Sequence, residues 1–421
     1  MRFASVPAWL AWQQTAHPVE VDPGLERVGA VWAKLGVAFP ATVLTVGGTN
    51  GKGSVAAYLD AILTAAGYET GLFTSPHLLR YNERIRIRGR EVADAELLAA
   101  FAEIEAAREG ISLSFFEWNT LAAFLVFARA RVDVAVLEVG MGGRLDAVNL
   151  LDADAAAVVS VGLDHREWLG DTLEAIGAEK AGIFRAGKPA IFGERRMPRS
   201  VAAQAAAIGA RLRRIGTDFD YVERGDGWDY VGFGSRRREL PLPALRGVSQ
   251  LGNAAVALAM LESTEPKLLV PDAAVRAGLA SVRLAGRFQV VAGRPEWILD
   301  VAHNVEAAES LAASLAARPR EGRSIAVCGI LGDKDVEAIV AALAREFSHW
   351  LVVGLDSPRA LPAVELASRI ERAGGAAVLA VADVAAGMER ARSEALPGDR
   401  IVVFGSFLTV GPGLAWLAAG S

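Results

Sequence analysis

The sequence predicts an α/β protein in which parallel sheets are covered by helices on both faces. Short apolar runs alternate with helical patterns in the first part of the chain, and the same alternation returns after residue 297. The chain has 421 residues, 52% of them apolar, which is more than one hydrophobic core usually organises. We therefore expect at least two domains.

The first part of the chain carries strand and helix patterns in alternation. The expected strands are short runs with β-branched residues, at 41–46, 132–139, 155–161 and 190–192. The expected helices are 54–66, 94–109, 120–131 and 173–181. Residues 218–240 break this rhythm with alternating aromatic, glycine and charged residues, which favour an inserted antiparallel hairpin. A helix that bears Gln250, Asn253 and residues 254–261 is expected after it.

The second part of the chain repeats the strand and helix alternation. Its expected strands are 297–301, 324–327, 350–353 and 401–404. Glycine, arginine and proline punctuate residues 287–295, which we predict to be a linker. The predicted domains are therefore an N-terminal one at 1–286 and a smaller, Rossmann-like one at 296–421.

Charge and cysteine content argue against several classes of protein. The formal net charge of −5 does not suit a nucleic-acid-binding groove, which needs a cationic excess. The single cysteine, Cys328, lies in an apolar run and cannot form an internal disulfide, which indicates the reducing cytoplasm. The N-terminus does not read as an export signal, and no apolar run reaches the length of a bilayer. Neither export nor a membrane span is expected.

Residues 47–54 read Gly-Gly-Thr-Asn-Gly-Lys-Gly-Ser and lie between an expected strand and an expected helix. In such a turn, backbone N–H groups and the helix dipole converge on a polyphosphate, and Lys52 adds a positive charge. The standard motif would need glycine at Val46, and here Gly53 separates Lys52 from Ser54. A flexible surface turn is the alternative. The strand–loop–helix context favours a phosphate loop, and hence a P-loop-type ATPase domain.

This form of the loop resembles the folate branch of the Mur ligase superfamily, the bifunctional dihydrofolate synthases/folylpolyglutamate synthases. The resemblance runs in order from about Leu25 to Leu408, and its specificity lies in the ordered set of motifs. The further motifs are Thr-Ser-Pro-His-Leu at 74–78, Tyr-Asn-Glu-Arg-Ile at 81–85, Glu-Val-Gly-Met-Gly-Gly-Arg-Leu-Asp at 138–146, Leu-Asp-His at 163–165, Glu-Lys-Ala-Gly at 179–182, Gly-Arg-Phe at 286–288, Asp-Val-Ala-His-Asn at 300–304 and Asp-Lys-Asp at 333–335.

The resemblance implies a Mg2+ site with Ser75, Glu138 and His165 as ligands. It also implies that CO2 carbamylates Lys180, which turns an ammonium into an anionic oxygen ligand. Glu138 fits by position too, because it closes an apolar strand at the edge of a sheet where α/β ligand sites lie. Without the resemblance, a glutamate in the position of Glu138 is a helix cap or an ion-pair partner as often as it is a metal ligand. Lys180 alone would be interpreted as a lysine on a solvated helix surface.

Catalytic roles are then implied for Lys52, Lys180 and His165. Five histidines occur in the chain, and His77 and His303 also fall inside the motifs. For these two, hydrogen bonds that order a loop are an equally good interpretation.

For ATP, the resemblance implies contacts from the phosphate loop and from three later residues. These are Thr49, Asn50, Gly51, Lys52, Gly53, Ser54, Asn253, Arg287 and Asp300. Asp300 follows an apolar run, so we expect it at the end of a strand, facing a cleft between the domains that holds the active site. Arg287 could then reach the phosphates only on domain closure. Two residues depart from the family: Val305 stands where proline is common, and Leu408 where close relatives carry histidine.

Three segments match those that hold the pterin in the bifunctional folate enzymes. They comprise Asp22, Gly24 and Leu25, then Ser114, Phe115, Phe116 and Glu117, and finally Arg144, Leu145, Asp146 and Ala147. An aromatic face with a carboxylate suits a flat heterocycle rich in donors. Pro23 departs from the usual apolar residue, and at least one of Phe115, Phe116 and Trp118 equally fits a packing role.

The implied reaction phosphorylates a substrate carboxylate with ATP, after which L-glutamate attacks the acyl phosphate. Dihydropteroate and folates are the implied partners, with no nucleic acid and no membrane, and a monomer is expected. One alternative is a Mur ligase acting on a cell-wall precursor, which would need a separate N-terminal domain, whereas only about forty residues precede the phosphate loop. The other alternative is a P-loop ATPase that works as a switch, for which a Walker B acidic pair would be usual.

Overall fold

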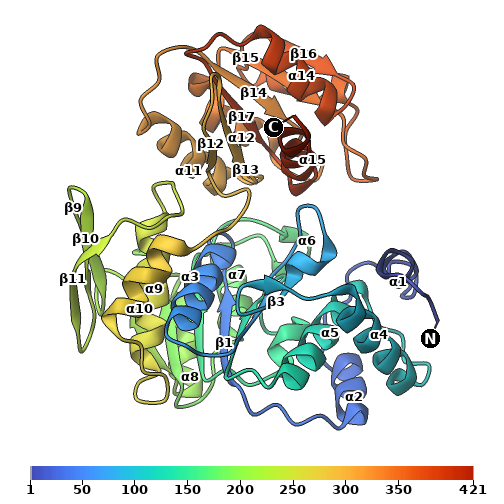
Figure 1. Cartoon of the computed structure of the whole chain (residues 1–421), viewed down its shortest axis with the longest axis vertical. Coiled ribbons are helices and arrows are strands. Elements are labelled where there is room, and N and C mark those ends of the chain that lie inside the picture. Colours follow the sequence, from blue (N-terminus) through green and yellow to red (C-terminus); the bar gives the residue numbers. More distant parts are fainter. Residues whose placement is uncertain (1, 421) are drawn as a thin grey trace. The chain divides into compact units, whose positions relative to one another are not determined.

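The computed structural model describes residues 2–420, which form two compact units (Figure 1). The first unit runs to Pro76 and includes Tyr81–Ala244 and Leu251–Val282. The second unit consists of His77–Arg80, Leu245–Gln250 and the chain from Arg283 onward. Each unit has its own parallel sheet, so the predicted α/β fold with two domains is confirmed.

The first unit is built on an eight-stranded sheet with the order β4-β3-β2-β5-β1-β6-β7-β8. The strands are β1 (Thr42–Gly47), β2 (Thr70–Phe73), β3 (Ile85–Ile87), β4 (Arg90–Glu91), β5 (Val134–Glu138), β6 (Ala155–Val158), β7 (Pro189–Phe192) and β8 (Arg211–Arg214). From β2 to β8 all neighbours are parallel, and β3 and β4 extend the sheet in antiparallel pairs. The carboxyl ends of β1, β5 and β6 therefore meet at one edge, where ligand sites of α/β proteins lie.

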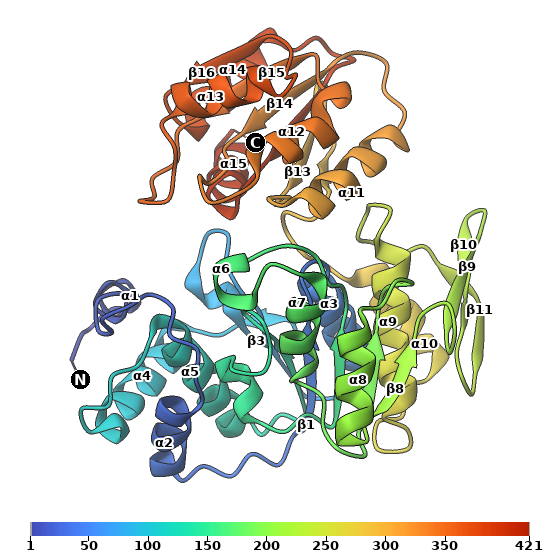
Figure 2. The ribbon, with the colours of Figure 1, turned by 180° about the vertical axis from the view of Figure 1, so that it is seen from behind.

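Helices cover both faces of this sheet, as Figures 1 and 2 show from opposite sides. They are α1 (Val6–Gln13), α2 (Glu26–Leu35), α3 (Lys52–Ala65), α4 (Asp94–Arg108), α5 (Phe115–Ala130), α6 (Arg166–Leu169), α7 (Leu173–Ala181), α8 (Arg199–Ile208), α9 (Gln250–Ser263) and α10 (Asp272–Ser281), with 3-10 turns η1 (Tyr81–Arg84) and η2 (Ala147–Leu150). Ala135 and Leu137 of β5 join the core formed with α4, α5, α7 and α8, while α3 packs on β1, β2 and β5. Because side chains alternate along a strand, both faces of β5 are buried, which explains its continuous apolar run.

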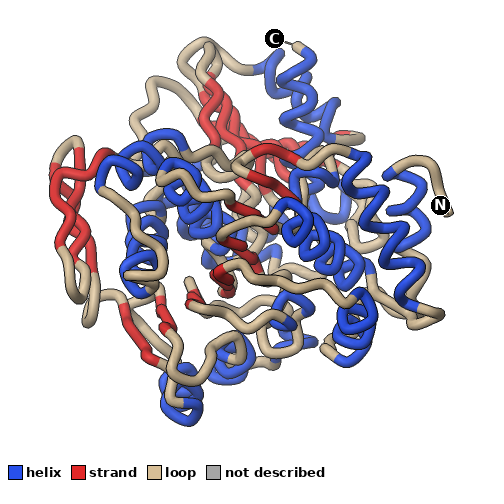
Figure 3. Tube along the Cα trace, turned by 60° about the horizontal axis from the view of Figure 1, so that its bottom comes forward, coloured by secondary structure: helices blue, strands red, loops and turns tan. Residues whose placement is uncertain are grey.

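The stretch expected as an inserted hairpin forms a separate antiparallel sheet of three strands. These are β9 (Asp220–Arg224), β10 (Gly227–Val231) and β11 (Arg236–Pro241), in the order β11-β10-β9, drawn red in Figure 3. Trp228 and Tyr230 of the central strand are fully buried. The prediction of an antiparallel insertion is therefore confirmed, with one strand more than a hairpin has.

The second unit holds a six-stranded sheet with the order β12-β13-β17-β14-β15-β16. Its elements are β12 (Gln289–Val291), β13 (Glu296–Asp300), α11 (Val305–Ala316), β14 (Ser324–Cys328), α12 (Val336–Leu343), η3 (Ala344–Glu346), β15 (His349–Val353), α13 (Ala363–Arg372), β16 (Val378–Val381), α14 (Val384–Glu394), β17 (Arg400–Phe404) and α15 (Phe407–Ala419). One core lies between the sheet and α11–α13, and another between the sheet and α14 and α15. Leu78, from the short segment His77–Arg80, packs against the second of these cores.

One observation qualifies the predicted organisation. Residues 287–295 were expected as a linker, but Gln289–Val291 pair with β13 as the antiparallel edge strand of the second sheet. Cys328 is buried at the end of β14, as its apolar neighbours suggested, and burial raises the pKa of its thiol to about 12. Within residues 2–420, no helix combines the length and the apolar character that crossing a bilayer demands.

Candidate active site

The phosphate loop connects β1 to α3 at the carboxyl edge of the first sheet. Gly51, the N-cap of α3, has φ +85°, and Gly48 has φ +145°, conformations that favour glycine. Ser160, just after β6, braces the loop: its hydroxyl accepts the N–H of Asn50 at 2.8 Å and donates to the Asn50 carbonyl at 2.9 Å. The Lys52 ammonium donates to carbonyls of its own loop, 3.0 Å from Gly48 O. The loop is thus preformed around the first turn of α3.

Two contacts join this loop to neighbouring segments. Thr49 Oγ1 accepts the N–H of Gly162 at 2.9 Å, which joins the loop to the segment after β6. A Cβ at Gly51 would lie only 2.7 Å from Oδ1 of Asn253, so the Asn253 side chain, in the first turn of α9, packs directly on the loop. The structure therefore brings Asn253 together with the loop, as the family resemblance implies.

Glu138 ends β5 beside the phosphate loop, because it is in register with Val46 of β1. Its side chain is buried, and its Oε2 accepts the backbone N–H of Ser75 at 3.2 Å. Two of the expected metal ligands are therefore together. Burial lowers the pKa of the nearby Arg84, while Tyr81 and Glu138 raise it. Arg84 lies in a motif of the sequence, but was not foreseen as a site residue.

Lys180 lies in α7 and is 3% exposed, so the interpretation as a solvated helix lysine is wrong. Burial, and then the positive charge of Lys52, lower its pKa from 10.5 to about 7, while Asp164 and Asp146 act in the opposite direction. Lys180 therefore shares the electrostatic environment of the phosphate loop. His165, one residue after Asp164, is exposed at the N-cap of α6 with φ +52°.

The expected metal ligands are not a conventional cluster of acidic and histidine residues. Across residues 2–420, no group of three or more His, Cys, Asp or Glu side chains is arranged to hold an ion. Within the expected set, only Glu138 and His165 are of these types, and the other oxygen atoms would come from the Ser75 hydroxyl and a carbamate on Lys180. Hard oxygen donors of this kind suit Mg2+, which retains several waters.

Asp146 belongs to the predicted pterin segment 144–147. Its buried carboxylate accepts the N–H groups of Met141 at 2.9 Å and Val148 at 3.0 Å. Burial raises its pKa to about 6, although these hydrogen bonds and the charge of Lys52 lower it. The neighbouring Leu145 carbonyl accepts the N–H of Gly24 at 3.2 Å, which brings segments 22–25 and 144–147 together.

The third segment, 114–117, forms the start of α5. Ser114 Oγ accepts the N–H of Glu117 at 3.3 Å, and Glu117 Oε2 accepts the N–H of Ser114 at 2.7 Å, so the two residues form a capping box. Phe116 packs on Gly140, where an added Cβ would lie 2.6 Å from its ring. Trp118 is fully buried against Trp9 and other aromatic rings, which confirms the packing interpretation for that residue.

Four more residues of the predicted pterin segments have other surroundings. Arg144 is exposed and pairs with Glu179 at 2.7 Å, while Ala147 is buried at the start of η2. Phe115 packs with its ring on Tyr81. Leu25 is the half-buried N-cap residue of α2.

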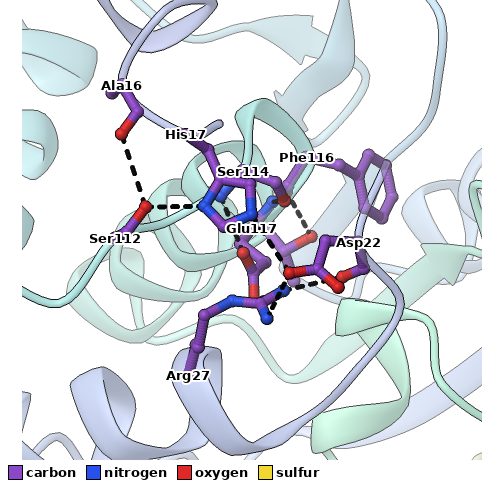
Figure 4. A network of polar contacts seen from close by, with 9 residues as sticks. Ala16, His17, Asp22, Arg27, Ser112, Ser114, Phe116 and Glu117 are labelled. Carbon is purple, nitrogen blue, oxygen red and sulfur yellow. Dashed lines mark hydrogen bonds and ion pairs between the residues drawn. The ribbon is translucent and has the colours of Figure 1, made fainter. Parts of the chain in front are cut away.

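Two residues that the sequence did not single out hold the 22–25 segment (Figure 4). Asp22 Oδ2 is 2.6 Å from Nη1 of Arg27 and 3.1 Å from Nε2 of His17. Arg27 Nη2 also lies 3.3 Å from Oε1 of Glu117. The motif pattern contains no signal for His17, because its second partner, Ser112, is 95 residues away.

In the second unit, Arg287 and Asp300 lie close together. Asp300 Oδ2 accepts the N–H of Phe288 at 2.7 Å, and Oδ1 accepts that of Ala302 at 2.8 Å. Burial raises the pKa of Asp300, and the charge of Arg287 is the largest effect that opposes it. The Arg287 guanidinium is 5.3 Å from the centre of the Phe407 ring.

Three other residues of the second unit that the sequence singled out are His303, Val305 and Leu408. Nδ1 of His303 lies 2.7 Å from the Val301 carbonyl, which supports a loop-ordering role for this histidine. Val305 is the first residue of α11, whose N-cap Asn304 accepts the N–H of Ala307 at 3.0 Å, so the departure from proline leaves the helix start intact. Leu408 is 42% exposed in the first turn of α15.

Comparisons with known proteins show the family of this chain. The family model of the Mur ligase middle domain matches residues 46–218, and that of the Mur ligase, glutamate ligase domain matches 286–407. The dihydrofolate synthase/folylpolyglutamate synthase of Escherichia coli K12 is 45% identical over 96% of this chain and 93% of its own length. That of Haemophilus influenzae is 37% identical, over 96% and 95%.

Solved structures give the same result. E. coli FolC in complex with DHPP and ADP has a TM-score of 0.94 at 43% identity, covering 99% of this chain and 98% of that one. A bifunctional folylpolyglutamate synthase/dihydrofolate synthase with Mn, AMPPNP and L-glutamate bound has a TM-score of 0.91 at 43% identity, with the same coverage. These matches disfavour a cell-wall Mur ligase. The chain belongs to the dihydrofolate synthase/folylpolyglutamate synthase family of Mur ligases, whose members are ATP-dependent glutamate ligases.

Proposed function

We propose that this enzyme adds L-glutamate to dihydropteroate, and further glutamates to the γ-carboxylate of reduced folates. The observation that carries the proposal is the arrangement of the first unit. There, a phosphate loop and the buried Glu138 lie at the same sheet edge, and Gly24 bonds to the 144–147 segment. The relatives described above bear both activities in their names.

Each glutamate addition is proposed to follow two balanced steps. An oxygen of the substrate carboxylate attacks the γ-phosphorus of ATP, the bond to the bridging oxygen breaks, and ADP leaves. The glutamate amine then attacks the acyl carbon, the acyl–oxygen bond breaks, and phosphate leaves as the amine loses a proton. A carboxylate is a poor electrophile until its oxygen becomes a good leaving group, which is why ATP is needed. Lys52 and the backbone N–H groups of its loop stabilise the charge that collects on the phosphates.

A divalent ion, when bound, would neutralise phosphate charge. We propose Mg2+ with Ser75, Glu138, His165 and a carbamylated Lys180 as its protein ligands. The structure with Mn, AMPPNP and L-glutamate bound supports ATP together with a divalent metal in this family. In this chain, the contact of Ser75 with the buried Glu138 supports the first two ligands.

The environment of Lys180 supports its carbamylation. Only a neutral amine attacks CO2. Because the pKa of Lys180 is about 7, about half of its amine is neutral at pH 7. The reaction forms an N–C bond and releases one proton, which gives an anionic carbamate. Lys52 disfavours an ammonium at this position by repulsion, but it attracts a carbamate. The same neighbour therefore favours both the reactive amine and its product.

For the nucleotide, we propose contacts from the phosphate loop, Asn253, Arg287 and Asp300. The packing of Asn253 on Gly51 supports its part in this set. The effect of the Arg287 charge on the pKa of Asp300 supports a shared role for these two within the second unit. Monomeric state and a cytoplasmic location stay predictions, and size-exclusion chromatography with light scattering would test the first.

The test is ADP release by purified protein with the substrates added one at a time. Turnover should require dihydropteroate and L-glutamate together, and mass spectrometry should show dihydrofolate. With a tetrahydrofolate monoglutamate as the acceptor, the diglutamate should form. A Lys52→Ala variant is the control, because it removes the phosphate-loop charge. Robust ADP release with ATP alone would favour the ATPase switch, and nucleotide binding without any glutamyl conjugate would refute the proposal.

A further inference from the structure

His17 lies in the loop between α1 and α2, outside every motif of the sequence. Its side chain is 9% exposed, although Pro18, Val19 and Glu20 beside it are exposed. Nδ1 of the ring lies 2.6 Å from Oγ of Ser112, and Nε2 lies 3.1 Å from Oδ2 of Asp22 (Figure 4). Both ring nitrogens have partners, so the ring is held in one orientation.

These two contacts connect segments that are far apart in the sequence. Asp22 opens the 22–25 segment, whose Gly24 bonds to the Leu145 carbonyl. Ser112 lies two residues before Ser114, the N-cap of α5. His17 therefore joins the loop that carries one predicted pterin segment to the start of the helix that carries another.

Proton assignment follows from the chemistry of the partners. A carboxylate only accepts hydrogen bonds, so Nε2 of His17 must donate to Asp22. In the neutral ring, Nδ1 then accepts the single proton of the Ser112 hydroxyl, 2.6 Å away, in preference to the Ala16 carbonyl at 3.4 Å. The charged groups around His17 are Asp22, then Arg27, which pairs with Asp22, and Glu117, which pairs with Arg27. Asp22 thus receives one donor from His17 and another from Arg27.

We propose that His17 is a positioning residue that sets affinity for the pterin end of dihydropteroate, an inference that rests on the function proposed above. Without the His17 donor, Arg27 is the one remaining side-chain donor to the Asp22 carboxylate among the contacts shown in Figure 4. The Asp22 side chain can then follow Arg27 instead of being held between two donors. The 22–25 segment keeps the bond of Arg27 Nη2 to the Asp22 carbonyl, 2.7 Å, and the bond of Gly24 to Leu145, so the change is confined to the orientation of the Asp22 carboxylate and the phosphate loop is unchanged.

Two substitutions separate the two contacts of the ring. In His17→Asn, the amide lies near the position of Nδ1 and reaches Ser112 but not Asp22. In His17→Gln, the longer side chain places an amide donor near the position of Nε2 and restores the bond to Asp22. His349→Asn is the matched control, because His349 also faces a carboxylate, 3.4 Å from Glu394, in the second unit.

Steady-state kinetics and calorimetric titration of dihydropteroate into the ADP-bound protein provide the test. His17→Asn should raise the dihydropteroate KM and Kd about ten-fold, the size expected for a lost hydrogen bond to a charged group, with KM for ATP and glutamate unchanged. His17→Gln should stay within about three-fold of the wild type, and His349→Asn should match it.

Three results would contradict this positioning role. They are an unchanged dihydropteroate Kd in His17→Asn, equal losses in His17→Asn and His17→Gln, and a general loss of activity with a lowered Tm. A wild-type protein that fails to bind dihydropteroate would instead refute the proposed function itself.

Discussion

Replacing the buried Lys180 with methionine should abolish activity and make the fold more stable. Methionine fills a similar volume without an amine, so it removes both the proposed carbamylation site and the group that is unfavourable to bury. The effect on stability can be worked out from the pKa of Lys180, which is about 7 in the folded protein against an ordinary value of 10.5.

The sign of this effect follows from the protons bound by each state. Between pH 7 and 10.5, the unfolded chain keeps the Lys180 proton and the folded protein has lost it, so stability rises with pH across this window. Below pH 7 both states are protonated, and the cost of burying the ammonium is fully present. At about 1.4 kcal/mol per pKa unit, that cost is roughly 4–5 kcal/mol of unfolding free energy.

Chemical unfolding in CO2-free buffer measures this cost directly. K180M should exceed the wild type by roughly 4–5 kcal/mol at about pH 6.5, and by only about 1–2 kcal/mol at about pH 9.5. K188M is the matched control, because Lys188 is 48% exposed and pairs with Asp154 at the surface. Its stability should stay within about 0.5 kcal/mol of the wild type at either pH.

Activity gives the second measurement on the same variants. K180M and K180A should release ADP at least about 100-fold more slowly than the wild type, and added bicarbonate should not restore them. With 13C-labelled bicarbonate, NMR should show a carbamate signal in the wild type and in K188M, but not in K180M. Wild-type turnover in K180M, or a stability difference that does not change with pH, would refute this reasoning.

Three more predictions follow from the first unit. Glu138→Gln should lower turnover about 100-fold and raise the Mg2+ concentration needed for half-maximal ADP release, because the charge of a proposed ligand is lost. An unchanged Mg2+ titration would contradict this prediction. The KM for dihydropteroate should rise as pH falls through about 6, because Asp146 then gains a proton, and Asp146→Asn should give a high KM that no longer varies with pH in this range. Gly51→Ala should raise the KM for ATP about ten-fold, because the added Cβ meets Oδ1 of Asn253. Gly36→Ala is the control: Gly36 also has a positive φ, but nothing lies within 4 Å of an added Cβ, so the KM for ATP should not change.

The fold was predictable where strands are covered on both faces. β5 and β17 are continuous apolar runs for this reason. β2 was not predicted because it has only four residues, two of which are threonine and glycine. β8 was not predicted because it is an edge strand with the sequence Arg-Leu-Arg-Arg, which has one apolar residue. Helix α5 begins at Phe115, five residues before the predicted start at 120, because a capping box precedes its apolar run.

For the site, local motifs could be recognised and long-range contacts could not. The phosphate loop and Glu138 were evident because a strand and its following loop are adjacent in sequence. The burial of Lys180 was not evident, since α7 has the composition of an ordinary surface helix and only its packing excludes solvent. His17 depends on a partner 95 residues away, and no spacing rule connects two loops across that distance.

The short segment His77–Arg80 has a consequence for dividing this protein into fragments. This segment supplies the Leu78 side chain to the second unit, whereas the rest of that unit comes from positions after 244. Cδ1 of Leu78 lies 3.3 Å from the position that a Cβ on Gly286 would take. A fragment beginning at Arg283 would therefore expose the apolar surface that Leu78 covers. The carboxy-terminal region is not an independently transplantable module, and excising it by a single cut should yield a fragment prone to aggregation.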